Sequence, residues 1–135
     1  MIRYMLDTNA CIGVINGRPP VLRARLLQVD PAEVAISQIV HYELAFGVCN
    51  SSQPQRNRAN LAHFLRYVQV LDWGEEQATE AAAIRCDLQR QGRPIGPYDL
   101  LIAGHARSLP ATLVTHNTGE FGRVDGLQIE DWELP

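Results

Sequence analysis

A chain of 135 residues with 46% hydrophobic and 20% charged residues can bury a core of its own and is too apolar to be disordered. Fifteen acidic residues outnumber twelve basic ones, and a net charge of −3 does not indicate general nucleic-acid binding. All twelve bases are arginines, however, and their planar guanidinium groups suit a polyanionic substrate. No apolar run approaches the roughly 20 residues that cross a bilayer, and Asp7 interrupts any secretory signal. We therefore expect a single cytoplasmic domain over residues 1–135.

Strands and amphipathic helices alternate along the chain. The first predicted strand, residues 2–6, is a short apolar run that ends at Asp7. Further strands are predicted over Val34–Ile36, Val68–Leu71, Thr112–Thr115 and Leu127–Ile129. Helices are predicted over Asn9–Ile15, Val21–Val29, a segment capped by Ser37 that buries Ile39, Val40, Leu44 and Val48, Arg56–Tyr67, Glu75–Gln91 and Tyr98–Ala106. This alternation predicts parallel β-α-β units and an α/β/α sandwich.

Two smaller predictions concern burial. In the helix over Glu75–Gln91 the apolar residues repeat at helical spacing, so we expect Ala78, Ala81, Ile84 and Leu88 to face inward. The three cysteines at positions 11, 49 and 86 are odd in number and form no C-x-x-C pair, which predicts buried, reduced thiols rather than disulfides or a zinc site.

Acidic and amide residues occur on four separate predicted elements: Asp7, Glu43, Asp99, and Asn117 with Glu120. Each has a structural explanation when taken alone. Asp7 can cap a helix, Asp99 can favour a helix dipole, Glu43 can be a solvated helical residue, and Asn117-x-x-Glu120 has the spacing of a capping box.

Together these residues indicate a metal site. In the predicted topology Asp7 and residues 115–117 follow strand carboxyl ends, while Glu43 and Asp99 lie early in helices that begin at the same edge. Like charges about 4 Å apart repel by about 4 kcal/mol at an effective dielectric of about 20, so such a cluster requires a cation or a shared proton. Hard oxygen ligands favour Mg²⁺ or Mn²⁺, which can activate water and neutralise a scissile phosphate.

Other catalytic patterns are weak. The four histidines show no spacing typical of zinc or of a catalytic triad, although His116 is a candidate for substrate contact, and no glycine-rich phosphate loop is present. A phosphoacceptor receiver domain would need a lysine, and the chain has none. A phosphatase with an aspartyl nucleophile would want a second Asp where Asn9 stands.

Four sequence blocks resemble the motifs of PIN-domain ribonucleases, most closely the VapC toxins of bacterial VapBC toxin–antitoxin modules. The resemblance covers essentially the whole chain, and its blocks are Met5–Asn9, Tyr42–Leu44 with Gly47, Gly92–Ala103, and Val114–Asn117 with Glu120 and Phe121.

This resemblance implies a five-stranded parallel sheet and a Mg²⁺- or Mn²⁺-dependent endoribonuclease site. Asp7 and Asp99 resemble the principal metal ligands, and Glu43 would complete the acidic triad directly or through water. Asn117 stands where many relatives have a fourth Asp, so the presence of a second metal stays open, and Glu120 is a candidate to compensate. Substrate contacts are assigned to a further set: Thr8, Arg93, Thr115 and His116.

The loop Gly92–Gly96, the block at residues 115–117 and the segment Glu130–Trp132 resemble especially the subgroup that cuts initiator tRNA in its anticodon loop. The resemblance also implies a homodimer and a cognate VapB antitoxin as partners. A non-catalytic PIN scaffold that binds RNA or a protein partner is the remaining alternative.

Overall fold

The apolar runs predicted as strands form one parallel sheet in residues 1–134, the part of the chain that the computed structural model describes. Its strands are β1 (Tyr4–Leu6), β2 (Val34–Ser37), β3 (Gln69–Leu71), β4 (Thr112–Val114) and β5 (Ile129–Glu130). The five strands lie in the order β3-β2-β1-β4-β5, and every neighbouring pair is parallel. Strand β1 is therefore central. Both β1 and β2 are buried throughout, which explains their unbroken apolar sequences.

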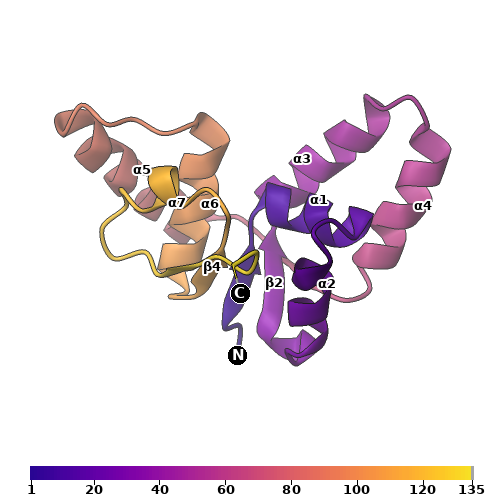
Figure 1. The fold of residues 1–135 in the computed structure, drawn as a ribbon. Helices are drawn as coiled ribbons and strands as arrows, with labels where there is room; N and C mark the ends of the chain where they lie inside the picture. The colour runs from indigo at the N-terminus through magenta and orange to yellow at the C-terminus, as the bar shows by residue number, and fades with distance from the viewer. Residues whose placement is uncertain (135) are drawn as a thin grey trace.

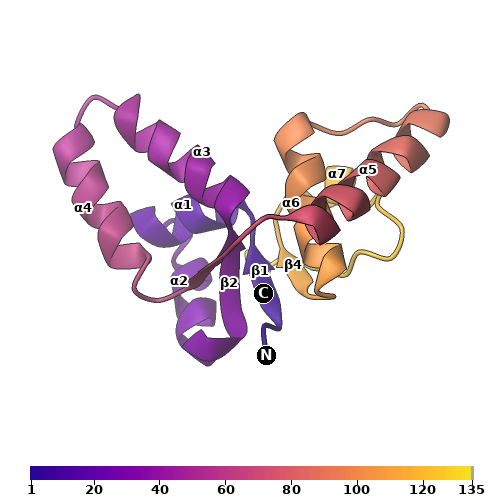
Figure 2. The same cartoon turned by 180° about the vertical axis from the view of Figure 1, so that it is seen from behind.

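Helices cover both sides of this sheet, as predicted for an α/β/α sandwich (Figure 1). They are α1 (Thr8–Asn16), α2 (Pro20–Leu27), α3 (Gln38–Cys49), α4 (Pro54–Phe64), α5 (Glu75–Arg90), α6 (Pro97–Ser108) and α7 (Thr118–Phe121), with a 3₁₀ turn over Pro31–Glu33. Helices α1 to α4 lie on one side of the strands and α5 to α7 on the other, as both views show (Figures 1 and 2). The pairs α3/α4 and α5/α6 diverge from the sheet as two arms.

Some predicted element boundaries are wrong by two or three residues. The helix expected to reach Tyr67 ends at Phe64, because the N–H groups of Arg66 and Tyr67 bond the carbonyls three residues earlier and tighten the chain into a turn before β3. The last strand begins at Ile129 rather than Leu127, because the Leu127 N–H bonds the Val124 carbonyl in a turn.

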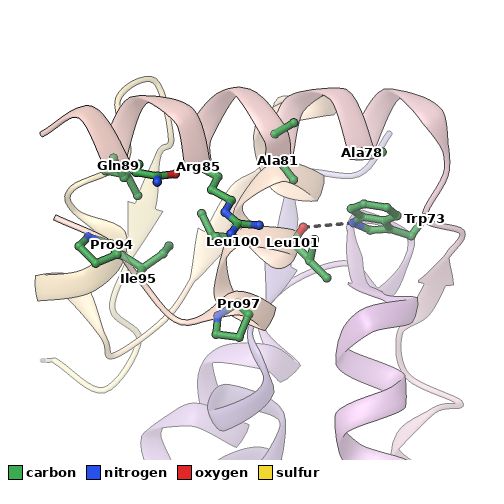
Figure 3. Close-up of a pocket in the computed structure, with 12 residues that line it drawn as sticks. Trp73, Ala78, Ala81, Arg85, Gln89, Pro94, Ile95, Pro97, Leu100 and Leu101 are labelled. Atoms are coloured by element: carbon green, nitrogen blue, oxygen red, sulfur yellow. Dashed lines mark hydrogen bonds between the residues drawn. The ribbon is translucent and has the colours of Figure 1, made fainter. Parts of the chain in front are cut away.

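Two burial predictions are also partly wrong. In α5, Ala81, Ile84 and Leu88 are buried, but Ala78 is exposed at the rim of an apolar hollow between α5 and α6, where Trp73 Nε1 donates to the Leu101 carbonyl at 3.2 Å (Figure 3). Of the cysteines, Cys11 is buried, whereas Cys49 and Cys86 are exposed on outer helix faces. Their position follows from the helical register, because the apolar residues of α3 and α5 turn the opposite faces toward the core.

No helix among the described residues is both long and apolar enough to span a bilayer.

Candidate functional site

The central strand β1 delivers Asp7 to the carboxyl edge of the sheet, next to the end of β4. Asp7 is only 4% exposed, and its N–H donates to the Val114 carbonyl at 3.1 Å. Its Oδ1 also accepts from the Ala10 N–H at 2.8 Å, so Asp7 caps α1 as the structural explanation had it. Burial raises the pKa of Asp7, and the charges of Glu133 and Glu43 add to this, whereas the Thr115 hydroxyl and the Ala10 N–H oppose it. The cap therefore does not cancel the effect of burial and neighbouring negative charge on the pKa of Asp7.

Helix α3 brings Glu43 to the same edge. Ser37 ends β2 and begins α3, where its Oγ accepts from the Ile39 N–H at 3.1 Å. The Thr8 hydroxyl, in the first turn of α1, donates to Glu43 Oε1 at 2.6 Å. Thr8 therefore orients the Glu43 carboxylate beside Asp7. In this structure Thr8 acts on a site residue, and its predicted contact with substrate stays a prediction.

Asp99, in the first turn of α6, faces the other acids. Burial raises its pKa to about 6, and the charges of Glu120, Glu43 and Asp7 each add to the rise. Gly96 marks the closeness of two of these groups, because a Cβ added there would lie 3.4 Å from Asp99 Oδ2 and 3.7 Å from Glu120 Oε1. Three carboxylates that are far from Asp99 along the chain, those of Asp7, Glu43 and Glu120, are therefore within electrostatic reach of it.

Glu120 differs from Asp7 and Asp99 because hydrogen bonds outweigh burial in shifting its pKa. Its Oε1 accepts from the Gly96 N–H at 2.7 Å, and its Oε2 accepts from Asn117 Nδ2 at 2.5 Å. These bonds lower the pKa of Glu120, with the Gly96 N–H as the largest cause. The capping-box explanation of Asn117 and Glu120 is wrong, since the Asn117 N–H donates to Thr115 Oγ1 at 2.9 Å instead of to Glu120.

The donor set fits a divalent cation. Burial and neighbouring carboxylates raise the pKa values of Asp7 and Asp99, because they disfavour the ionised forms. A cation bound among these acids would offset that cost. Within residues 1–134, the ligand oxygens of Asp7, Glu43 and Asp99 do not all lie within 4.8 Å of one another. Mg²⁺ keeps several water ligands and binds proteins through one or two carboxylates, so it does not require all three oxygens to be in contact.

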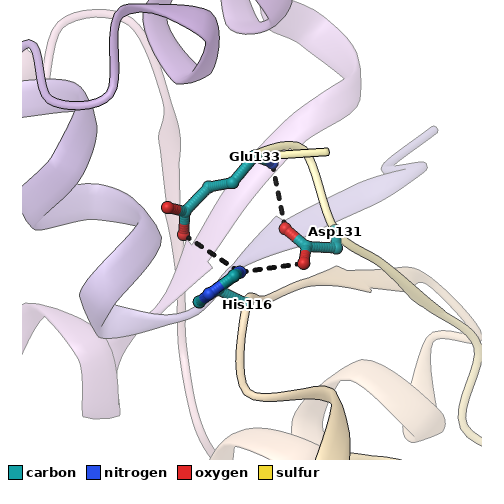
Figure 4. A group of neighbouring side chains, drawn as sticks. All are labelled: His116, Asp131 and Glu133. Carbon is teal, nitrogen blue, oxygen red and sulfur yellow. Dashed lines mark hydrogen bonds and ion pairs between the residues drawn. The ribbon is translucent and has the colours of Figure 1, made fainter. Parts of the chain in front are cut away.

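A second cluster lies beside these acids. His116 Nδ1 is 2.8 Å from Asp131 Oδ2 and 3.6 Å from Glu133 Oε2 (Figure 4), and the three groups offer ligand atoms within 4.8 Å of one another. The bond to Asp131 and the charge of Glu133 raise the pKa of His116, which favours an ion pair. Histidine spacing could not reveal this cluster, because the pairing of β4 with β5 brings the three residues together.

The remaining predicted substrate residues lie around this edge. Thr115 is fully buried, and its hydroxyl oxygen accepts from the Asn117 N–H, so it positions Asn117 at this edge. Arg93 is exposed on the loop between α5 and α6, three residues before Gly96. The exposed ring of Tyr98, which directly precedes Asp99 and meets Tyr42, was not singled out from the sequence. In the sequence, only the position of Tyr98 directly before Asp99 could have indicated that this tyrosine lies near the site.

Comparisons with known proteins agree with this architecture. The PIN domain family matches residues 4–127. A curated relative from Shigella flexneri, named tRNA(fMet)-specific endonuclease VapC, is 45% identical over 132 residues, covering 98% of this chain and 99% of the relative. Ribonuclease VapC2 from Haemophilus influenzae is 39% identical over the same shares of both chains. The crystal structure of DNA-bound VapBC from Salmonella typhimurium superposes with a TM-score of 0.93 at 42% identity, over 98% of this chain and 99% of that one.

The chain therefore belongs to the PIN domain family and, within it, to the VapC ribonucleases.

Proposed function

We propose that this chain is the toxin of a VapBC pair, an endoribonuclease that requires Mg²⁺ or Mn²⁺ and cuts initiator tRNA in its anticodon loop. The observation that carries the proposal is the meeting of Asp7, Glu43 and Asp99 at the carboxyl edge of β1. The substrate follows from the near full-length similarity to proteins named for tRNA(fMet). We further propose that the protein acts in the cytoplasm as a homodimer, and that a VapB antitoxin silences it, as the VapBC complexes among its structural neighbours suggest.

Each residue has a distinct task in this proposal. Asp7 and Asp99 would hold the ion, and Glu43, oriented by Thr8, would complete the set. The bound ion supplies a water of lowered pKa and neutralises charge on the scissile phosphate. Glu120 stays ionised because the Gly96 N–H and the Asn117 amide donate to it, so its charge helps to hold the ion in place. The raised pKa of Asp99 means that cation binding must compete with a proton near neutral pH.

The test is cleavage of total tRNA by purified wild type, Asp7→Asn and Asp99→Asn in Mg²⁺, in Mn²⁺ and in excess chelator. We expect each variant to cleave about 100-fold more slowly or worse, because the ligand charge is lost. Glu76→Gln on the exposed surface of α5 is the matched control, since it removes one negative charge away from the site.

Sequencing of the new RNA ends locates the cut. Cuts confined to the anticodon loop of initiator tRNA support the whole proposal. Cuts in other RNAs would reject the substrate and keep the nuclease. Equal cleavage by wild type and Asp7→Asn, or full activity in chelator, would contradict a metal-dependent site at Asp7. Binding without cleavage would support the non-catalytic scaffold.

A further inference from the structure

Two exposed tyrosines contact each other near the acids of the proposed ion site. Tyr42 on α3 is 54% exposed and Tyr98 at the start of α6 is 43% exposed. Their ring centroids are 5.6 Å apart with an interplanar angle of 43°, and their hydroxyl oxygens are 3.4 Å apart. Helices α3 and α6 belong to the two diverging arms of the fold (Figure 1), so the contact between the two rings links the arms.

Each tyrosine directly precedes an acid of the site: Tyr42 precedes Glu43, and Tyr98 precedes Asp99. Neighbouring Cα atoms are about 3.8 Å apart, so the backbone of each tyrosine lies next to that of a proposed ion ligand. The hydrogen bond with the Tyr42 hydroxyl is the largest cause that raises the pKa of Tyr98, and the charge of Glu43 adds a smaller rise. The influence of Glu43 on Tyr98 places this ring beside an acid of the other helix.

Core packing does not explain these rings, because large parts of both face solvent. Their hydroxyls meet each other. Phe46, another exposed aromatic residue, lies one helical turn beyond Tyr42 on the same face of α3. An aromatic surface therefore leads outward along α3 from the acids.

The chemistry of the site indicates what such a surface would bind. The acids repel the phosphates of RNA, and the net charge of −3 gives no general attraction, so uncharged contacts would add to the affinity that the arginines supply. Stacking of a base on an aromatic ring is such a contact, and it needs a base whose face is free. A base within a duplex already has both faces covered, whereas a base in a loop does not.

We propose that Tyr42 and Tyr98 form a stacking platform for an unpaired nucleobase of RNA beside the phosphodiester to be cut. This inference rests on the proposed nuclease function and adds a rule for substrate choice: single-stranded loops are bound and duplexes are not. It would position the substrate without any base-specific hydrogen bond from the rings.

The test measures binding apart from cleavage, in the Asp7→Asn background for every protein. The probe is an RNA hairpin that carries 2-aminopurine, a fluorescent base, in its loop, and a fully paired duplex with the same label is the comparison. We expect the hairpin to bind with quenched fluorescence. Tyr42→Leu and Tyr98→Leu should weaken this binding by about 5- to 150-fold and remove the quenching.

Two sets of variants separate stacking from other roles. Tyr42→Phe and Tyr98→Phe keep the ring, so each should bind the hairpin more tightly than its Leu counterpart. Tyr67→Leu is the matched control, because Tyr67 is also 45% exposed but lies past the end of α4, against His63. Its affinity for the hairpin should equal that of the parent protein.

The possible results are distinct. Equal hairpin affinity for the Leu and Phe variants would overturn the platform, as would equal binding of hairpin and duplex. Unchanged RNA binding with an altered dimer mass in ultracentrifugation would also overturn it, and would assign the rings to a second copy of the chain. Tyrosine-dependent quenching in a protein whose wild type cuts no RNA would support the platform and reject the nuclease.

Discussion

His105 links the two helices that carry Glu43 and Asp99, and its protonation should loosen the fold. The side chain is 1% exposed on α6, and its Nδ1 lies 2.8 Å from Oγ of Ser37, the cap of α3. Ser37 Oγ also accepts from the Ile39 N–H, so one hydroxyl ties His105 on α6 to the first turn of α3. Protonation of His105 would bury a positive charge, which costs stability.

The size of the effect follows from the pKa. Burial lowers the pKa of His105 from 6.5 to about 4, so the unfolded chain takes up the proton first as the pH falls. The stability associated with neutral His105 is complete above about pH 6.5 and is lost progressively down to about pH 4. From these values the loss is about 1 kcal/mol at pH 5.5 and about 2 to 3 kcal/mol at pH 4.5.

The assay is urea unfolding of wild type and His105→Asn at pH 7, 5.5 and 4.5, in chelator so that metal binding does not contribute. Asparagine does not titrate, so the stability of wild type should fall more steeply than that of the variant by the stated amounts. Comparing the two proteins cancels the titration of the carboxylates. His63→Asn, at an exposed position on α4, is the control and should follow wild type. Parallel pH profiles for wild type and His105→Asn would refute the reasoning.

Three further predictions test other parts of the structure. Gly104→Ala should destabilise the protein by about 1 to 3 kcal/mol in urea unfolding, because the new Cβ would lie 2.7 Å from Ala81 Cβ; Gly119→Ala, with nothing within 4 Å, should not clash. Asp99→Asn should stabilise the protein in chelator by about 1 to 3 kcal/mol at pH 7.5. The pKa of Asp99 is raised from 3.8 to about 6, so ionisation of this carboxyl lowers the stability of the folded protein as the pH rises through that range. Equal stability of variant and wild type would contradict this. Thiol labelling of the native protein should modify the two exposed cysteines and spare Cys11, whose pKa burial raises; rapid labelling of Cys11 without unfolding would contradict its placement.

The sequence by itself was sufficient for the order of elements and for most of the acids. Strand β1 could be predicted because its apolar run ends at an acid, and α5 because its buried residues recur at helical spacing. Such signals are local, since they depend on the period of one element and on its caps. They fail where a local signal is ambiguous, as at Ala78 and at the end of α4.

Only the tertiary structure decided how distant residues meet. Asp7 caps α1 and also lies within electrostatic reach of Asp99, so one side chain combines a structural role with a place in the proposed site, which no local pattern could show. The Gly96 N–H reaches Glu120 across 24 residues, and Tyr42 reaches Tyr98 across 56. These contacts depend on which strand lies beside β1 and on how α3 and α6 pack. That register is set by the packing of the whole core, and therefore by no single stretch of the chain.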